Sequence, residues 1–308
     1  MSCKNEVLSC FPRSGFFVLP TPPIFLATGS QTLRYLHART TQDLKLLGTG
    51  DSCLAGCLDG QGKTQAIITI QCLEPETSYL IIADGGELEE VRNAILQFRV
   101  TEQISLDPIP NTAIVHLFGA APDSLELSHQ PIHIIPSVRT IYPGWDLCFP
   151  TATLHDIRTE LQNVCNEISN ETWKAFRIAS RRFHFPHEIQ PGKTFLESAP
   201  SSALTIGKGC YPGQEVVEKT LARGKSPFQT LPFFIRSNEA REEGSSVYES
   251  NDVSENASSR PFGQIISIGA LPNQQGQCAA VRIRNTQEPI PSTLYLSNGT
   301  SLELIPAL

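Results

Sequence analysis

The segment 207–215 holds the side chains of this chain that are best suited to chemistry. It reads Gly-Lys-Gly-Cys-Tyr-Pro-Gly-Gln-Glu, and the Pro-Gly pair after Cys210 is typical of a tight turn. The glycines would let another molecule approach the thiol closely. A short helix is expected at 215–222, ending near Gly224, so Cys210 would lie just ahead of a helix N-terminus and beside Lys208. Both neighbours would stabilise a thiolate, the nucleophilic form of cysteine.

A lone cysteine is more often a small buried hydrophobic residue than a reactive group. Spacing alone therefore leaves a functional and a structural role for Cys210 about equally supported. The order of the residues adds a resemblance, because Lys208 to Glu215 fits K-G-C-Y-x-G-Q-E, the signature of the YgfZ-type folate-binding proteins. These are iron–sulfur cluster assembly and repair factors related to the glycine-cleavage T-protein, a folate-dependent aminomethyltransferase. The resemblance implies that Cys210 and Lys208 carry the chemistry and that Tyr211, Gln214 and Glu215 contact folate.

Two stretches upstream of the signature extend the resemblance. Residues 35–44 resemble an F-L-Q-G-Q-x-T-x-D-V segment of the family, which makes Thr41 and Asp43 candidate site residues. An amphipathic helix followed by a capped turn would explain the same pattern without a ligand. Arg177 begins an Arg-Ile pair that YgfZ-type proteins and T-proteins share, and 185–189 parallels their x-P-x-x-E-L stretch. Spacing alone favours a helix-end role for Arg177, whereas the resemblance places it in the folate cavity, paired with a folate carboxylate.

Departures from the related sequences bear on the reaction. Gln65 aligns with the acidic residue that lies next to the reacting folate nitrogen in T-proteins, and a glutamine cannot accept a proton there. Trp145 stands where T-proteins carry a glutamate that hydrogen-bonds the pterin ring, and it offers a flat face for stacking instead. Glu218 and Lys219 replace an Ala-Arg pair that usually follows the signature, so a bidentate guanidinium is lost. Aminomethyl transfer is therefore not expected.

Composition restricts the remaining function classes. The chain has 308 residues, of which 40% are hydrophobic and 18% charged, as in an ordinary soluble protein of two or three domains. A net charge of -7 argues against a general binder of nucleic-acid backbones. Nine scattered cysteines indicate a reducing compartment, which we take to be the cytoplasm, and no zinc site is expected at the isolated pair Cys53 and Cys57. No apolar run is long enough for a transmembrane helix.

The remaining patterns predict an α+β protein that ends in a small β-barrel. A hairpin is expected from 52–58 and 66–72, joined by the turn 59–63. Helical spacing predicts a helix that opens at Ser30 as its N-cap, and the helices 87–100, 155–168 and 170–179. Further strands are expected at 78–83, 113–119, 263–268, 277–284, 293–296 and 302–305, and an irregular segment from 131 to 146.

We therefore expect a T-protein-like folate-binding domain over 1–225 and a β-barrel domain over 226–308, with a mobile acidic loop near 237–259. The resemblance implies a tetrahydrofolate-binding accessory protein that supports the assembly or repair of iron–sulfur clusters in client enzymes, and through them tRNA modification. Its expected partners are folate and those clients or assembly proteins, without direct contact to nucleic acid or membrane. A folate-dependent aminomethyltransferase is the alternative, and a scaffold that has lost its ligand is a third reading.

Overall fold

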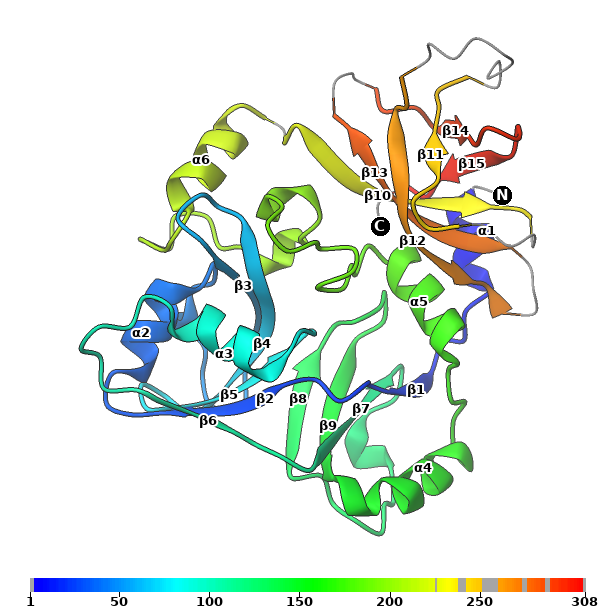
Figure 1. Cartoon of the computed structure of the whole chain (residues 1–308). Coiled ribbons are helices and arrows are strands. Elements are labelled where there is room, and N and C mark those ends of the chain that lie inside the picture. The colour runs from blue at the N-terminus through cyan, green and yellow to red at the C-terminus, as the bar shows by residue number, and fades with distance from the viewer. Residues whose placement is uncertain are drawn as a thin grey trace.

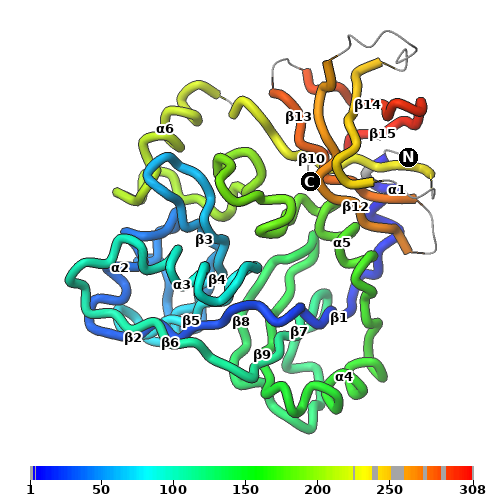
Figure 2. The backbone as a smooth tube through the Cα atoms, viewed as in Figure 1, coloured from blue at the N-terminus to red at the C-terminus, as the bar shows by residue number. Residues whose placement is uncertain are grey.

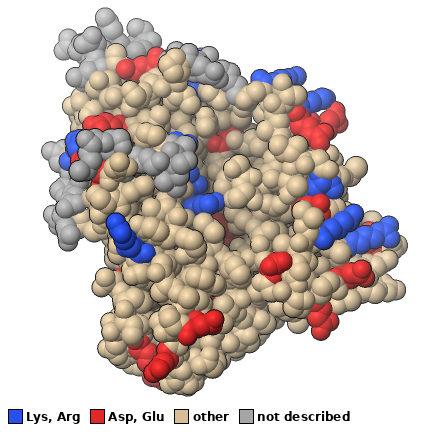
Figure 3. Space-filling view, turned by 180° about the vertical axis from the view of Figure 1, so that it is seen from behind, with Lys and Arg blue, Asp and Glu red and all other residues tan. Residues whose placement is uncertain are grey.

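The computed structural model describes residues 3–224, 226–237, 242–250, 260–272, 276–285 and 289–306. Most of the acidic loop expected near 237–259 lies outside these residues. The described chain forms three sheets in which all neighbouring strands are antiparallel, with helices packed around them (Figure 1). None of the described helices has the length and apolar character needed to cross a membrane. Basic and acidic side chains are interspersed on the face shown in Figure 3, without a broad basic patch on its described part.

The first sheet has five strands in the order β3-β4-β5-β2-β6. The bounds are β2 Ile24–Thr28, β3 Ser52–Leu58, β4 Thr64–Glu74, β5 Ser78–Ala83 and β6 Ser105–Pro108. Helices α2 (Thr32–Arg39) and α3 (Leu88–Leu96) cover one face, where alternate residues of β4 such as Ile68 and Ile70 pack against them. The expected hairpin of β3 and β4 is confirmed.

The second sheet has the order β1-β7-β9-β8 and packs against the free face of the first. Its strands are β1 Gly15–Val18, β7 Thr112–Phe118, β8 His133–Ser137 and β9 Gly144–Pro150. Helix α4 (Leu154–Gln162) covers its outer face through Ile157 and Leu161. The result is four layers, from α2 and α3 through the two sheets to α4. The expectation of an irregular segment from 131 to 146 was wrong, because β8 and part of β9 lie in it.

The third sheet is the C-terminal barrel, which confirms the expected fold class. Its order is β11-β12-β13-β10-β15-β14, with β10 Phe228–Ile235, β11 Ser246–Val247, β12 Gly263–Ala270, β13 Gln277–Arg284, β14 Thr293–Tyr295 and β15 Ser301–Leu304. A bridge between Tyr248 and Tyr295 brings the two edges together, so the barrel is nearly closed. Apolar side chains such as Phe233, Val281 and Leu302 fill its interior.

Helix α5 (Asn170–Ala179) joins the barrel to the other sheets (Figure 2). It lies so close to β12 that a Cβ at Gly269 would be 2.2 Å from the backbone nitrogen of Ala175. Helix α1 (Cys3–Ser9) also packs on the barrel side, where Glu6 pairs with Arg236. One large hydrophobic core therefore includes residues from all three sheets.

Several helix ends differ from the expected bounds. Gln31 is the N-cap of α2, and the Ser30 hydroxyl instead donates to Gln103 Oε1 at 3.0 Å, so the Ser30 cap was wrong. Helix α4 stops at Gln162 because the backbone of residues 166 and 168 bonds to Phe16 at the start of β1. The remaining α-helix is α6 Gln214–Ala222. Short 3-10 segments are η1 Leu44–Leu46, η2 Pro122–Ser124, η3 Thr151–Thr153, η4 Phe195–Glu197 and η5 Ser201–Ala203.

Candidate functional site

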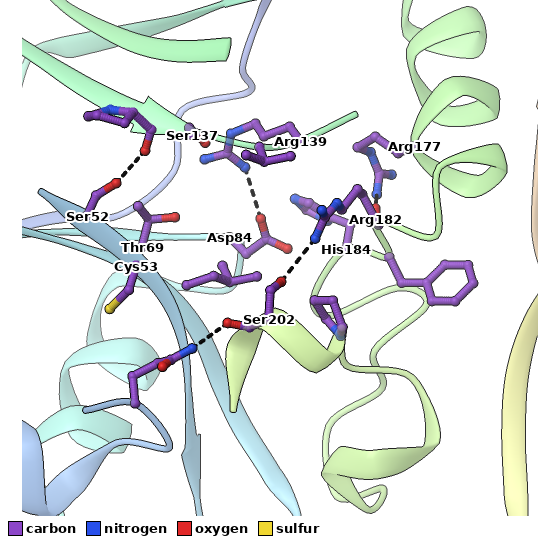
Figure 4. Close-up of a pocket in the computed structure, with 16 residues that line it drawn as sticks. Ser52, Cys53, Thr69, Asp84, Ser137, Arg139, Arg177, Arg182, His184 and Ser202 are labelled. Atoms are coloured by element: carbon purple, nitrogen blue, oxygen red, sulfur yellow. Dashed lines mark hydrogen bonds and ion pairs between the residues drawn. The ribbon is translucent and has the colours of Figure 1, made fainter. Parts of the chain in front are cut away.

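A cavity of about 380 Å³ lies where the first two sheets meet α5 and the segment 182–202 (Figure 4). We call it the central cavity. Its polar lining includes the side chains Ser52, Thr69, Asp84, Ser137, Arg139, Arg177, Arg182, His184 and Ser202. Leu54, Pro136, Phe183 and Pro200 supply apolar wall. The cavity therefore combines flat apolar surface with a concentration of arginines, which suits an anionic ligand with planar rings.

The charge of Arg139 is already compensated inside the protein. Its guanidinium donates to both carboxylate oxygens of Asp146 at 2.8–3.0 Å and to Asp84 Oδ1 at 3.1 Å. His116 Nδ1 lies 2.7 Å from Asp146, and burial lowers the pKa of His116, so the neutral imidazole donates. Burial opposes ionisation of Asp146, but Arg139 and His116 hold its pKa well below the usual range. The charge of Arg139 is therefore already compensated by Asp146 and Asp84, and its side chain is a fixed part of the cavity wall.

Arg177 lines the cavity from the last turn of α5, but it also has an internal partner. Its Nη1 lies 3.3 Å from Glu188 Oε2 and donates to the Arg182 carbonyl at 3.1 Å. Glu188 is almost fully buried and accepts further bonds from the His184 backbone and the Ser267 hydroxyl. Burial opposes its charge, yet Arg177 lowers the pKa of Glu188. The two stretches that resemble T-protein sequences, the Arg-Ile pair at Arg177 and residues 185–189, are thus joined by this ion pair at the cavity wall.

Arg182 is the cation of the cavity that lacks such compensation. Its Nη1 donates to the Ser202 hydroxyl at 3.1 Å, and it forms no ion pair with a carboxylate of the described residues. Burial lowers the pKa of Arg182. The neighbouring Arg181 turns away, at a φ of 54°, and donates to the Ile305 carbonyl of the barrel. Sequence reasoning missed Arg182, although it stands a few residues after the recognised Arg177.

The signature loop, residues 207–213, lies outside this cavity. Gly207, Gly209 and Gly213 have φ values of 77°, 111° and 81°, so the loop needs glycine at each position. A Cβ at Gly213 would lie 2.6 Å from the Gly62 backbone of the β3–β4 turn, which shows how tightly the loop is held there. Helix α6 begins directly afterwards, which confirms the predicted helix, and Cys210 is the exposed member of the nine cysteines.

Lys208 is partly buried behind the thiol. Its Nζ donates to the His37 carbonyl at the end of α2 and lies 5.1 Å from the ring centre of Tyr211. Burial lowers the pKa of Lys208 to about 8, although Asp43 and Cys210 act in the opposite direction. Lys208 is therefore near enough to the Cys210 thiol to be affected by its charge, and the reactivity expected of this thiol stays a prediction. Burial also raises the pKa of Tyr211 to about 12, so its hydroxyl stays protonated.

Residues 41–43 connect the signature loop to the cavity. The buried Thr41 hydroxyl donates to the Ala203 carbonyl and accepts from the Gly56 backbone at 2.8 Å. Gln42, which the sequence analysis did not single out, lines the cavity and donates to the Ser202 carbonyl. Asp43 caps η1 by accepting from the Lys45 backbone and lies 3.4 Å from His37. These residues hold the segment that runs from Ser202 toward Lys208.

The other candidates lie away from the cavity. Gln214 donates to Glu218 at 2.7 Å and Glu215 pairs with Lys219 at 2.6 Å, both along the exposed side of α6. Trp145 points from β9 toward the α4 layer, on the opposite face from Asp146. Of the residues predicted for the site, only Arg177 lines the central cavity.

Gln65 also lies outside the cavity. A register shift between Cys57 and Leu58 leaves Gln65 as a bulge in β4, and its side chain accepts from Arg39 at 2.8 Å. The carboxylate that the cavity does contain is Asp84, at the end of β5, which the alignment did not identify. Within the described part of the chain, no three His, Cys, Asp or Glu side chains are grouped so that they could hold a metal ion.

Known proteins resemble this chain in sequence and in fold. No protein-family model matches the chain. The chain is 26% identical to the tRNA-modifying protein YgfZ of Photorhabdus laumondii over 256 residues, which span 73% of this chain and 74% of that protein. It is 23% identical to an uncharacterized protein of Haemophilus influenzae over 242 residues, or 76% of this chain and 78% of that one.

Among solved structures, the glycine cleavage system aminomethyltransferase T from Bartonella henselae has a similar fold. The TM-score is 0.78 at 14% identity, over 97% of this chain and 86% of that chain. This likeness shows the fold, which is the T-protein fold that the sequence predicted. Sequence and structure together support a YgfZ-type, T-protein-like family for the chain.

Proposed function

We propose that this YgfZ-type chain binds a tetrahydrofolate in the central cavity and serves as an accessory protein in the assembly or repair of iron–sulfur clusters in other proteins. The observation that carries the proposal is Arg182, a partly buried guanidinium in the cavity without a described counter-charge. A desolvated cation is costly unless a ligand supplies negative charge. The planar guanidinium matches a carboxylate through paired hydrogen bonds, and folates end in carboxylates.

The shape and lining of the cavity support the same ligand class. Its volume of about 380 Å³ lies within the range of ligand pockets, roughly 300–1,000 Å³. Leu54 and Phe183 offer apolar surface to planar rings, while hydroxyl groups such as Ser137 can accept or donate at ring edges. The chain would bind and orient the folate, and the folate would supply the one-carbon chemistry.

An accessory role is favoured over aminomethyl transfer because a proton-accepting side chain is missing from the expected position. Gln65 is neutral, is bonded to Arg39, and lies outside the cavity. The cavity carboxylate, Asp84, already accepts from Arg139 and from the Phe185 backbone. We therefore propose that the bound folate does not receive an aminomethyl group from this protein.

The part of the proposal that concerns iron–sulfur clusters rests on the signature loop. Cys210 is exposed on a loop that is fixed on the β3–β4 turn, and Lys208 stands beside it. Such a thiol is accessible to a partner protein, whereas a thiol inside the cavity would not be. The relative from Photorhabdus laumondii is named a tRNA-modifying protein, and we propose that this chain supports tRNA modification through its client enzymes.

Anaerobic calorimetric titration of the full chain with tetrahydrofolate tests the proposal. We expect saturable binding at one site, and weaker binding of the pterin ring alone, because the ring lacks the carboxylates that Arg182 would hold. Absence of saturable binding would refute the folate assignment. Incubation with an aminomethyl-loaded carrier protein should yield no methylene-tetrahydrofolate, and its formation would support the transferase instead.

A further inference from the structure

Asp84 is the residue that brings a carboxylate into the central cavity. It follows β5 directly, and its carboxylate is the one acidic group among the residues that line the cavity. Its Oδ1 accepts from Arg139 Nη1 at 3.1 Å, and its Oδ2 accepts from the Phe185 backbone at 3.0 Å. The side chain is 10% exposed, and Figure 4 shows it directed toward Arg139.

The carboxylate is fixed by groups that are themselves fixed. Arg139 is held by Asp146 through both carboxylate oxygens, and Asp146 is held by the buried His116. An ionised carboxylate offers about four acceptor positions, and only two of those on Asp84 are used by the described residues. Each oxygen therefore keeps one acceptor position. Because Asp84 lines the cavity, a ligand bound there lies next to this carboxylate.

We propose that Asp84 recognises the pterin ring by accepting paired hydrogen bonds from its 2-amino group and the adjacent ring N–H. This inference rests on the proposed folate function. Two parallel N–H donors match a carboxylate in the way that a guanidinium does. Trp145, at the position of the pterin-binding glutamate of T-proteins, faces the α4 layer and has no acceptor. Asp84 supplies the missing acceptor from a different strand, and Arg182 supplies the group for the carboxylate end.

A merely structural Asp84 would anchor Arg139 and the Phe185 backbone without touching a ligand. Ligand preference separates the two roles. The probes are tetrahydrofolate and its analogue in which a C2 carbonyl replaces the 2-amino group, so that an acceptor stands where a donor was. Wild-type protein should prefer tetrahydrofolate by roughly ten- to a hundredfold, the contribution expected of charge-assisted hydrogen bonds.

Asp84→Asn should remove most of this preference, because a neutral amide presents one acceptor and one donor. Asp123→Asn, an exposed change in η2, is the matched control and should keep it. The ratio of the two affinities does not depend on the fraction of folded protein, so a loss of stability cannot imitate the result. An unchanged ratio in Asp84→Asn would overturn the inference alone. Failure of wild-type protein to bind either compound would overturn the folate assignment, and the inference with it.

Discussion

The central cavity and the signature loop differ in how their side chains are held and in how accessible they are to other molecules. In the cavity, Arg139 and Arg177 are fixed by carboxylates within a wall of two sheets and a helix, and Arg182 is the cation without such a partner among the described residues. In the loop, glycines with positive φ carry the backbone outward and leave Cys210 exposed. A ligand site needs preorganised groups around an enclosed space, whereas a thiol that meets other proteins needs access. Under the proposed function, ligand binding and thiol reactivity would therefore lie in two different regions of the chain.

The two regions are separate but connected. The segment from Pro200 to Lys208 leaves the cavity wall and becomes the signature loop. Thr41 and Gln42 bond to this segment at Ala203 and Ser202. A ligand that presses on Ser202 would therefore act on a segment whose other end holds Lys208. The difference between the regions can be tested with one variant of each kind of cavity arginine, and with one variant in the loop.

Arg177→Ala should have the largest effect, and it should be an effect on stability. Removing Arg177 leaves Glu188, which is 1% exposed, without its ion-pair partner. Breaking a buried pair in this way costs about 3–5 kcal/mol in the free energy of unfolding. Urea denaturation of the variant measures the loss, and adding Glu188→Gln should recover part of it because the uncompensated charge is then removed.

Arg158→Ala is the matched control for that measurement. Arg158 pairs with Glu167 at 2.8 Å, but its side chain is 54% exposed, so its loss should cost at most about 1 kcal/mol. If Arg177→Ala were no more destabilising than Arg158→Ala, the cavity wall would not depend on buried pairs, and Arg177 would be free to bind the ligand as the sequence analysis expected.

Arg182→Ala should show the opposite pattern, with a change in affinity and little change in stability. Arg182 has only the Ser202 hydroxyl as a described side-chain partner, so its removal leaves no buried carboxylate behind. Loss of a charge-assisted bond to the folate carboxylate should weaken tetrahydrofolate binding by roughly ten- to a hundredfold. Arg182→Lys should restore part of the affinity, because lysine keeps the charge but not the planar fork.

Measuring affinity and unfolding on the same samples of Arg182→Ala distinguishes the two kinds of arginine. An unchanged affinity together with a large loss of stability would make Arg182 a structural residue like Arg177. The comparison between compensated and uncompensated cations would then no longer identify the ligand-binding group.

The loop was predictable from sequence because its signals are local. The Pro-Gly turn, the glycines around Cys210 and the start of α6 all lie within one short run. The β3–β4 hairpin and α5 were predictable for the same reason, since turn residues and helical spacing mark them directly. The residues of such a motif determine its backbone conformation locally, so the sequence indicated the loop without knowledge of the rest of the fold.

The cavity was not predictable in the same way because its residues are distant in the chain. Asp84, Arg139 and Arg182 come from separate elements and meet only when the two sheets pack together. Strand β9 depends on pairing with β7 and β8, and Pro136 in β8 hides the strand pattern. The bulge at Gln65 likewise changes which residues face the cavity, and an alignment by spacing cannot reveal it.

The smallest expected effect concerns the pH dependence of Cys210 alkylation, which we expect to be fastest at this exposed thiol. Lys208 interacts with Cys210, and burial lowers the pKa of Lys208 to about 8. Below pH 8 Lys208 carries a positive charge near the thiol, and a nearby cation generally makes a cysteine more reactive, so Lys208→Met should slow labelling by iodoacetamide about two- to fivefold, as expected for a partly screened charge pair. As the pH rises above 8, Lys208 loses its proton and the rates of the two proteins should converge.

Lys219→Met, on the exposed side of α6, serves as the control and should follow the wild type throughout. A rate ratio that stayed constant from pH 6.5 to 9.5 would show that Lys208 acts on the thiol through the position of the loop and not through its charge, and the loop would then resemble the cavity in depending on fixed geometry.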